Sequence, residues 1–151
     1  MNEKDFESAS EEEFTRHVIK PLINVPITEL VQGSYSHLVS LKEMTISFIR
    51  MEAGSVFELH THPNEQCMIV TEGYCDEIIN NKIYRVQKGD VIYLPANIPH
   101  GAFIRDHDCC AIDIFSPPRK DYIEKYIQQN ASIPIFDSFA ESDPRNQKPE
   151  A

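Results

Sequence analysis

The sequence predicts an all-β sandwich or barrel with a short helix near each end of the chain. Three observations support this fold class. Short runs of alternating or continuous apolar residues recur through the middle of the chain. Turn residues separate these runs at even spacing, and Gly54, Gly73 and Gly89 stand at expected strand ends. Closing such a sheet removes its unpaired edges and leaves a lumen in which a site can form.

Residues 1–40 form an extension before the strand-rich region. Ser10 and Glu13 have the spacing of a capping box, which predicts a short helix that ends before Pro21. Two runs with weak extended character follow and are separated by a glycine. We expect these runs to add edge strands or to reach over a partner subunit; they are Ile23–Val31 and Tyr35–Leu41.

Residues 41–116 carry the expected barrel. The Asn80-Asn81 pair lies between two extended runs and predicts a tight hairpin, because asparagine tolerates the positive φ that such a turn requires. The expected strands are Thr45–Met51, Val56–His62, Gln66–Thr71, Cys75–Ile79, Lys82–Val86, Val91–Leu94, Gly101–Arg105 and Cys109–Phe115.

A C-terminal helix is expected within residues 117–130. Two prolines end the last strand, and the apolar residues beyond them have helical spacing. Residues 131–151 are polar and contain prolines, which predicts a disordered tail. We find no internal repeat and no second domain. The apolar residues of the expected helix are Tyr122, Ile123, Tyr126 and Ile127.

The composition restricts the partners. A net charge of −10 argues against nucleic acid and against an anionic membrane surface. It does not argue against a small anionic ligand, because a bound cation can reverse the local potential. The acidic N-terminus does not read as a signal peptide, and no segment approaches the roughly 20 apolar residues that span a bilayer. We therefore expect a cytoplasmic protein whose four cysteines are reduced. The state of the adjacent Cys109 and Cys110 is left open.

Three histidines predict a metal site. His60 and His62 point to the same side of a strand because side chains alternate, and His100 lies on a distant strand. Imidazoles that converge in this way are better explained as ligands than as separate core residues. A fourth ligand could come from Gln66 or from the neighbouring Glu65, since alternation lets only one of them face the lumen.

Asp113, Phe115 and Arg119 are candidate residues for substrate chemistry. Asp113 lies on the last expected strand, where it is either a hydrogen-bonded structural carboxylate or a general acid or base. Arg119 follows two prolines and is either a clamp for a substrate carboxylate or a surface arginine paired with an acid. Phe115 either lines the substrate pocket or is an ordinary residue of the hydrophobic core.

Two motifs resemble the signature of the cupin superfamily. The first runs from Gly54 as G-x5-H-x-H-x3-Q-x6-G, and the second runs from Gly89 as G-x5-P-x-N-x2-H. Residues 41–126 further resemble small single-domain cupins of the KdgF pectin-degradation branch, through HTHPNEQ, GDVIYLPANIPHG and DIFSPPRKDY. The histidine motif is also similar to that of the bacilysin-pathway cupins. Unlike the compact members, this chain has a long extension before the matching region and a tail after it.

The resemblance implies a homodimeric jelly roll, or double-stranded β-helix, with one divalent transition metal per chain. It places Gln66 inward, so that the ligands are His60, His62, Gln66 and His100. A neutral amide leaves the charge of the ion uncompensated, which would make it a strong Lewis acid that attracts anions. Ligand type does not decide among Mn, Fe, Co, Ni, Cu and Zn.

The implied reaction opens 4,5-unsaturated monouronates to linear keto sugar acids, with Asp113 and Arg119 in catalysis and Phe115 in the substrate pocket. Two alternatives remain at this point. One is an isomerase or dioxygenase that acts on another small carboxylate at the same site, and the other is a non-catalytic module that binds a sugar acid.

Overall fold

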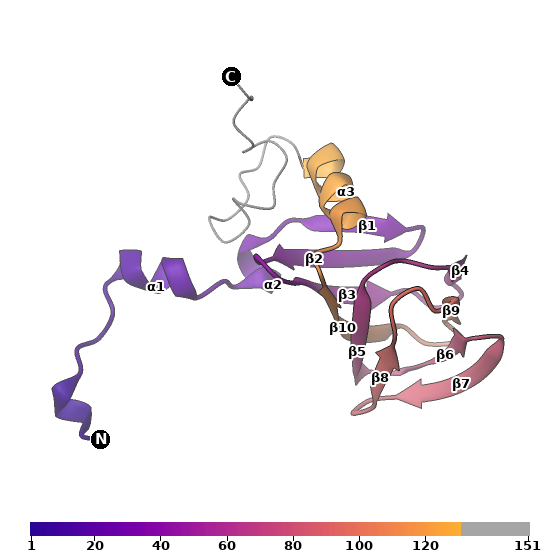
Figure 1. Ribbon diagram of the computed structural model, residues 1–151, viewed down its shortest axis with the longest axis horizontal. Helices are drawn as coiled ribbons and strands as arrows, with labels where there is room; N and C mark the ends of the chain where they lie inside the picture. The colour runs from indigo at the N-terminus through magenta and orange to yellow at the C-terminus, as the bar shows by residue number, and fades with distance from the viewer. Residues whose placement is uncertain (131–151) are drawn as a thin grey trace.

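A computed structural model describes residues 1–130, which fold into ten strands and a few short helices (Figure 1). The strands form two antiparallel sheets, one in the order β1-β2-β3-β10-β5-β8 and one in the order β4-β9-β6-β7. The predicted all-β sandwich is therefore confirmed. The expected tail at 131–151 lies outside the described residues.

The six-stranded sheet is built around β3 and β10, which pair over their full length from Cys109–Met51 to Phe115–Thr45. β3 and β8 have the predicted bounds, and β5 and β10 extend one or two residues beyond them. The strands are β1 Ile27–Val31, β2 Ser34–Ser40, β3 Thr45–Met51, β5 Glu65–Glu72, β8 Val91–Leu94 and β10 Cys109–Ser116.

The four-stranded sheet contains the predicted hairpin. Asn80 and Asn81 have φ values of 48° and 67°, as a two-residue turn with two left-handed residues requires. Two expected strands are too long: Val56–His62 ends at His60, which leaves His62 in the following loop, and Gly101–Arg105 ends at Phe103. The strands are β4 Val56–His60, β6 Tyr74–Ile79, β7 Lys82–Gln87 and β9 His100–Phe103.

The core lies between the two sheets and follows the alternation of the strands. From Cys109 to Phe115 on β10 every second side chain is buried, and the intervening ones are half-buried. Apolar residues supply most of the inward positions, including Leu94, Val70 and Ala111, but Asp113 and Glu77 also point inward. The interior is therefore apolar around a polar centre.

The N-terminal extension has more helix than the sequence predicted. The capping box is confirmed, since Ser10 Oγ accepts from the Glu13 N–H and the Glu13 carboxylate accepts from the Ser10 N–H at the start of α1 Glu11–His17. The first extended run begins only at Ile27, because Pro21 at the first helical position favours the short helix α2 Pro21–Asn24. A 3₁₀ turn, η1, spans Glu3–Asp5.

The C-terminal helix α3 Lys120–Asn130 packs on the hairpin of β1 and β2 (Figure 1). Tyr122, Ile123 and Tyr126 are buried, as their spacing predicted. Gln129 exchanges two hydrogen bonds with the Glu29 backbone, which ties the helix to β1. Within residues 1–130, no helix has the length and apolarity needed to cross a membrane.

Candidate metal centre and substrate groove

The three predicted histidines come together from three parts of the chain. His60 ends β4 and lies opposite His100 at the start of β9, while His62 belongs to the loop after β4. One ligand atom from each lies within 4.8 Å of the other two. Sequence reasoning was right about the cluster but wrong about its cause, because the loop rather than strand alternation orients His62.

Two backbone features bring these segments close. A Cβ at Gly101 would lie 2.6 Å from the Phe57 carbonyl oxygen, so the glycine permits the close approach of β9 to β4. The loop that carries His62 is held by a hydrogen bond from the Asn97 N–H to the His62 carbonyl, at 2.8 Å. The His100 ring therefore lies beside those of His60 and His62, with centroids 4.3 and 4.7 Å away.

Hydrogen bonds fix the tautomer of all three imidazoles. In each ring Nδ1 lies next to a backbone carbonyl oxygen, at 2.7 Å for His60, 3.0 Å for His62 and 2.8 Å for His100. A carbonyl oxygen only accepts, so each Nδ1 carries the proton and each Nε2 of a neutral ring keeps its lone pair. Such second contacts commonly orient histidine ligands toward a metal.

The bare nitrogens face one another. The Nε2 atoms of His62 and His100 are 3.1 Å apart, with no proton to share between them. Burial lowers the pKa of His62, and it lowers the pKa of His100 to about 4, so both rings are neutral at pH 7. A cation would relieve the repulsion between these lone pairs, and the donor set therefore fits a divalent metal.

Gln66 completes this arrangement, while Glu65 is exposed. Alternation along β5 buries Gln66, and its Oε1 lies 3.0 Å from His62 Nε2. Its Nε2 donates to Asp113 Oδ1 at 2.9 Å, so the carboxylate turns the amide oxygen toward the histidines. Of the two alternatives that the sequence left open, Gln66 is the one with an oxygen at the cluster.

Asp113 and Phe115 occupy inward positions of β10. Burial raises the pKa of Asp113 to about 6, against the hydrogen bond from Gln66 and the charge of Arg119. Phe115 is 1% exposed and meets His62 and Tyr122 edge to face, with ring centroids 5.7 and 5.5 Å apart. It therefore belongs to the core and also borders the histidine cluster.

Arg119 is buried and is not a surface arginine. Its Nε and Nη2 donate to the two carboxylate oxygens of Asp121 at 2.9 and 2.7 Å. The guanidinium lies over the Tyr122 ring, 3.7 Å from its centroid, and 4.8 Å from that of Phe115. A buried arginine held in a plane by aromatic rings suits recognition of a carboxylate.

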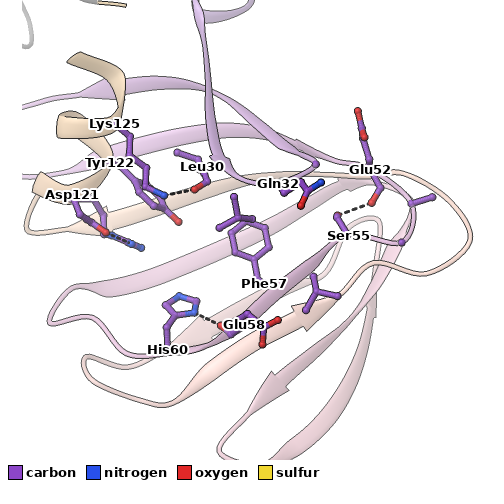
Figure 2. A pocket seen from close by; sticks show the side chains of 16 residues that line it. Leu30, Gln32, Glu52, Ser55, Phe57, Glu58, His60, Asp121, Tyr122 and Lys125 are labelled. Carbon is purple, nitrogen blue, oxygen red and sulfur yellow. Dashed lines mark hydrogen bonds and ion pairs between the residues drawn. The ribbon is translucent and has the colours of Figure 1, made fainter. Parts of the chain in front are cut away.

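Two cavities meet at His60. The outer groove has a volume of about 740 Å³ and runs between the β1–β2 hairpin, β4 and α3, as Figure 2 shows. The inner cavity has about 40 Å³ and lies among Gln66, His100, Asp113 and Glu77. Phe57, His60 and Tyr122 line both. The N-terminal extension thus supplies one wall of the groove.

Glu77 is an inward residue that sequence reasoning missed. Alternation along Cys75–Ile79 would have placed it on the same side as Cys75, and a charged residue there is a signal for a polar lumen. Lys125 was also missed; its Nζ donates to the Leu30 carbonyl at the edge of the groove (Figure 2). The four cysteines are free, as expected.

Comparison with known proteins identifies the fold. Residues 47–115 match the family model described as Cupin domain. An uncharacterized protein from Streptomyces coelicolor is 23% identical over 86 residues, which are 57% of this chain and 82% of that protein.

Two solved structures are similar over most of their length. An RmlC-like cupin from Shewanella frigidimarina has a TM-score of 0.64 at 24% identity, covering 70% of this chain and 95% of that one. KdgF from a Halomonas species has a TM-score of 0.59 at 24% identity, covering 64% and 89%. At these identities the likeness establishes the fold, and the activity must be argued from the site.

Proposed function

Because residues 47–115 form a cupin domain, we propose that this protein is a metal-dependent enzyme that opens or isomerises an unsaturated uronate to a linear keto sugar acid. The observation that carries the proposal is the set of three bare Nε2 atoms beside a buried carboxyl group and a buried arginine. Such a site can hold a cation, bind an acid and move a proton.

His60, His62, Gln66 and His100 would hold one divalent metal ion. When bound, the ion supplies Lewis-acid polarisation of a substrate oxygen. Three neutral rings and a neutral amide cancel none of its charge, which favours an anionic substrate over a neutral sugar. The choice among Mn, Fe, Co, Ni, Cu and Zn depends on more than these ligand types.

Arg119 would orient the substrate carboxylate. A guanidinium has five N–H donors, and Asp121 accepts from only Nε and one Nη2 hydrogen. Tyr122 also hydrogen-bonds the guanidinium, and we assign the donors that remain to a substrate carboxylate at the groove. The aromatic rings and Asp121 hold the guanidinium in place, so little rotamer freedom is lost when the substrate binds.

The two cavities suggest how the substrate lies. A monosaccharide acid fits the groove of about 740 Å³, whereas the inner cavity of about 40 Å³ admits only a small group. The reacting edge of the sugar would therefore enter past His60, where Asp113 takes or gives a proton. Phe115 would border this edge behind His62.

The test is turnover of unsaturated galacturonate and mannuronate monomers by protein loaded with each metal in turn. We expect loss of the conjugated chromophore with at least one metal, and about 100-fold less activity or lower with Asp113→Asn. No acceleration with any metal would overturn the uronate assignment. Oxygen uptake with iron would indicate a dioxygenase, and tight binding without turnover would indicate a binding module.

The proposal includes a homodimer. Leu22, Ile23 and Ile27 expose apolar side chains at the edge of the six-stranded sheet, and burial of such side chains is a common driving force for association. Light scattering on the full chain should give twice the monomer mass. A monomer mass at micromolar concentration would contradict this part of the proposal.

A further inference from the structure

Glu77 is a buried carboxyl group with little support from its neighbours. It lies on β6 and is 4% exposed. Within the described residues its hydrogen-bond partner is Cys75 Sγ, 4.0 Å from Oε2, which is a weak contact. No lysine or arginine pairs with it in residues 1–130. An inward carboxyl group with so little support costs stability, so a structural role is a poor explanation.

The side chain of Glu77 opens on the inner cavity together with Asp113. The two carboxyl groups come from different sheets, β6 from the four-stranded one and β10 from the six-stranded one (Figure 1). They therefore approach the same small space from opposite walls. His60, Gln66 and His100 border that space between them.

The charges around Glu77 favour its neutral form. The titratable groups that face it are Asp113 and Cys109 on β10 and Cys75 on its own strand, and His60 on β4 and His100 on β9 border the same cavity. Burial, and then the negative charge of Asp113, raise the pKa of Glu77 to about 8. Two carboxyl groups that open on one small cavity from opposite sheets are placed to act as an acid and a base on a single bound group.

We propose that Glu77 is a second catalytic residue, the general acid that protonates the ring oxygen of the substrate hemiacetal while Asp113 takes the proton of its hydroxyl group. This inference rests on the proposed function. It assigns opposite roles to two carboxyl groups that face the same atoms from two sheets.

The proton transfers balance within one isomerisation. Asp113 removes the hydroxyl proton, and the O–H electrons form the aldehyde carbonyl. The bond from that carbon to the ring oxygen breaks, its electron pair stays on the oxygen, and Glu77 protonates it. The product is the linear aldehyde with an enol, which becomes the keto acid by moving a proton from oxygen to carbon. Afterwards one proton must return from Asp113 to Glu77.

The size of the inner cavity suits both parts of this cycle. The reacting group is one carbon with two oxygens, a set small enough for the cavity. After product leaves, about 40 Å³ has room for a water molecule that can carry the proton between the two carboxyl groups.

The experiment compares Glu77→Gln and Glu77→Asp with wild-type protein and with the control Glu72→Gln, which removes an exposed carboxylate at the end of β5. Turnover of the unsaturated uronate is followed from pH 5 to 10, with metal content and circular dichroism of each variant. For Glu77→Gln we expect kcat to fall roughly 100-fold or more with KM nearly unchanged. Glu72→Gln should behave as wild type.

The outcomes separate this inference from the proposed function. If the wild-type protein turns over the uronate and the kcat of Glu77→Gln is within about twofold of the wild-type kcat, the role of Glu77 is overturned and the proposed function stands. No wild-type turnover of any uronate would overturn both. If Glu77→Gln does not fold, Glu77→Asp decides, because a shorter side chain moves the acid away from the reacting oxygen and must lower kcat. A wild-type kcat for Glu77→Asp would contradict the proposal.

Discussion

Asp76 and Glu77 are neighbours on β6, and both are buried, yet their surroundings are opposite. Asp76 accepts from Arg85 and Arg105 at 2.7–3.1 Å, and these arginines lower its pKa to about 2. Glu77 points to the other side and pairs with no arginine in the described part of the chain, and burial raises its pKa to about 8. One residue of strand alternation therefore separates a stabilising carboxylate from a carboxyl group that is costly to bury.

The outer surface and the lumen of the molecule differ in the same way as Asp76 and Glu77. Charges on the outer surface are paired or solvated, as in the pair of Arg50 and Asp108, which are both about half exposed. In the lumen the three histidines, Gln66 and the two carboxyl groups of Asp113 and Glu77 face one another, and within residues 1–130 neither carboxyl group forms an ion pair with a lysine or an arginine. We infer that the surface charges serve stability and the lumen groups serve a ligand, and the predictions below test that division.

The largest effect is expected from the histidines. His60→Ala combined with His62→Ala removes two of three converging nitrogens and should abolish stoichiometric metal binding, measured by elemental analysis after dialysis. His17→Ala with His107→Ala is the matched control, because these two histidines lie outside the cluster. Retention of one metal per chain in the first double variant would show that the lumen is not the metal site.

A smaller effect should follow from the charge of the fourth ligand. Gln66→Glu would cancel one unit of the charge on the ion, so we expect tighter metal binding but a KM for an acidic substrate raised about tenfold. It also places a carboxylate where Gln66 Nε2 donates to Asp113. Glu65→Gln removes an exposed charge nearby and should leave both quantities unchanged. Equal KM for Gln66→Glu and wild type would remove the electrostatic argument.

The two β6 residues should respond to pH with opposite sign. Asp76, whose folded pKa is depressed, adds stability above its unfolded pKa, and that stability is lost as pH falls toward 2. Glu77, whose folded pKa is raised, reduces stability as pH rises from about 4 to about 8. Thermal unfolding should therefore show Asp76→Asn destabilised by a few degrees at pH 7 but much less at pH 2.

For Glu77→Gln we expect a gain in Tm over wild type that is larger at pH 8 than at pH 5. A gain that is independent of pH would mean that the carboxyl group is not the cause. Destabilisation at both pH values would assign Glu77 a structural role in the lumen.

The smallest effect is expected in the N-terminal arm. Ser10→Ala removes the cap of α1, which stabilises an isolated helix by about 1 kcal/mol. No residue of α1 is buried, so the Tm of the full chain should change by less than about 2 °C and metal binding should not change. A large loss of Tm would show that the arm packs against something, such as a second copy of the chain.

Much of the fold was predictable because local patterns agree with the tertiary structure. Alternation in Thr45–Met51, the Asn80-Asn81 turn and the apolar spacing around Tyr122 all follow from backbone geometry, and each is confirmed. The errors lie where contacts decide the outcome. β4 ends at His60 since the loop that carries His62 bonds Asn97, a residue far away in sequence.

The candidate site likewise has features that the sequence predicts and features that depend on tertiary contacts. The sequence alone determined that three histidines come together in an all-β fold, because their motif spacing sets these positions, and the resemblance of the motif placed Gln66 inward. Only the tertiary structure decided which nitrogens carry protons, that Arg119 is buried against two aromatic rings, and that Glu77 faces Asp113 across the lumen. These features depend on contacts between distant segments, and such contacts are set when the two sheets close on each other.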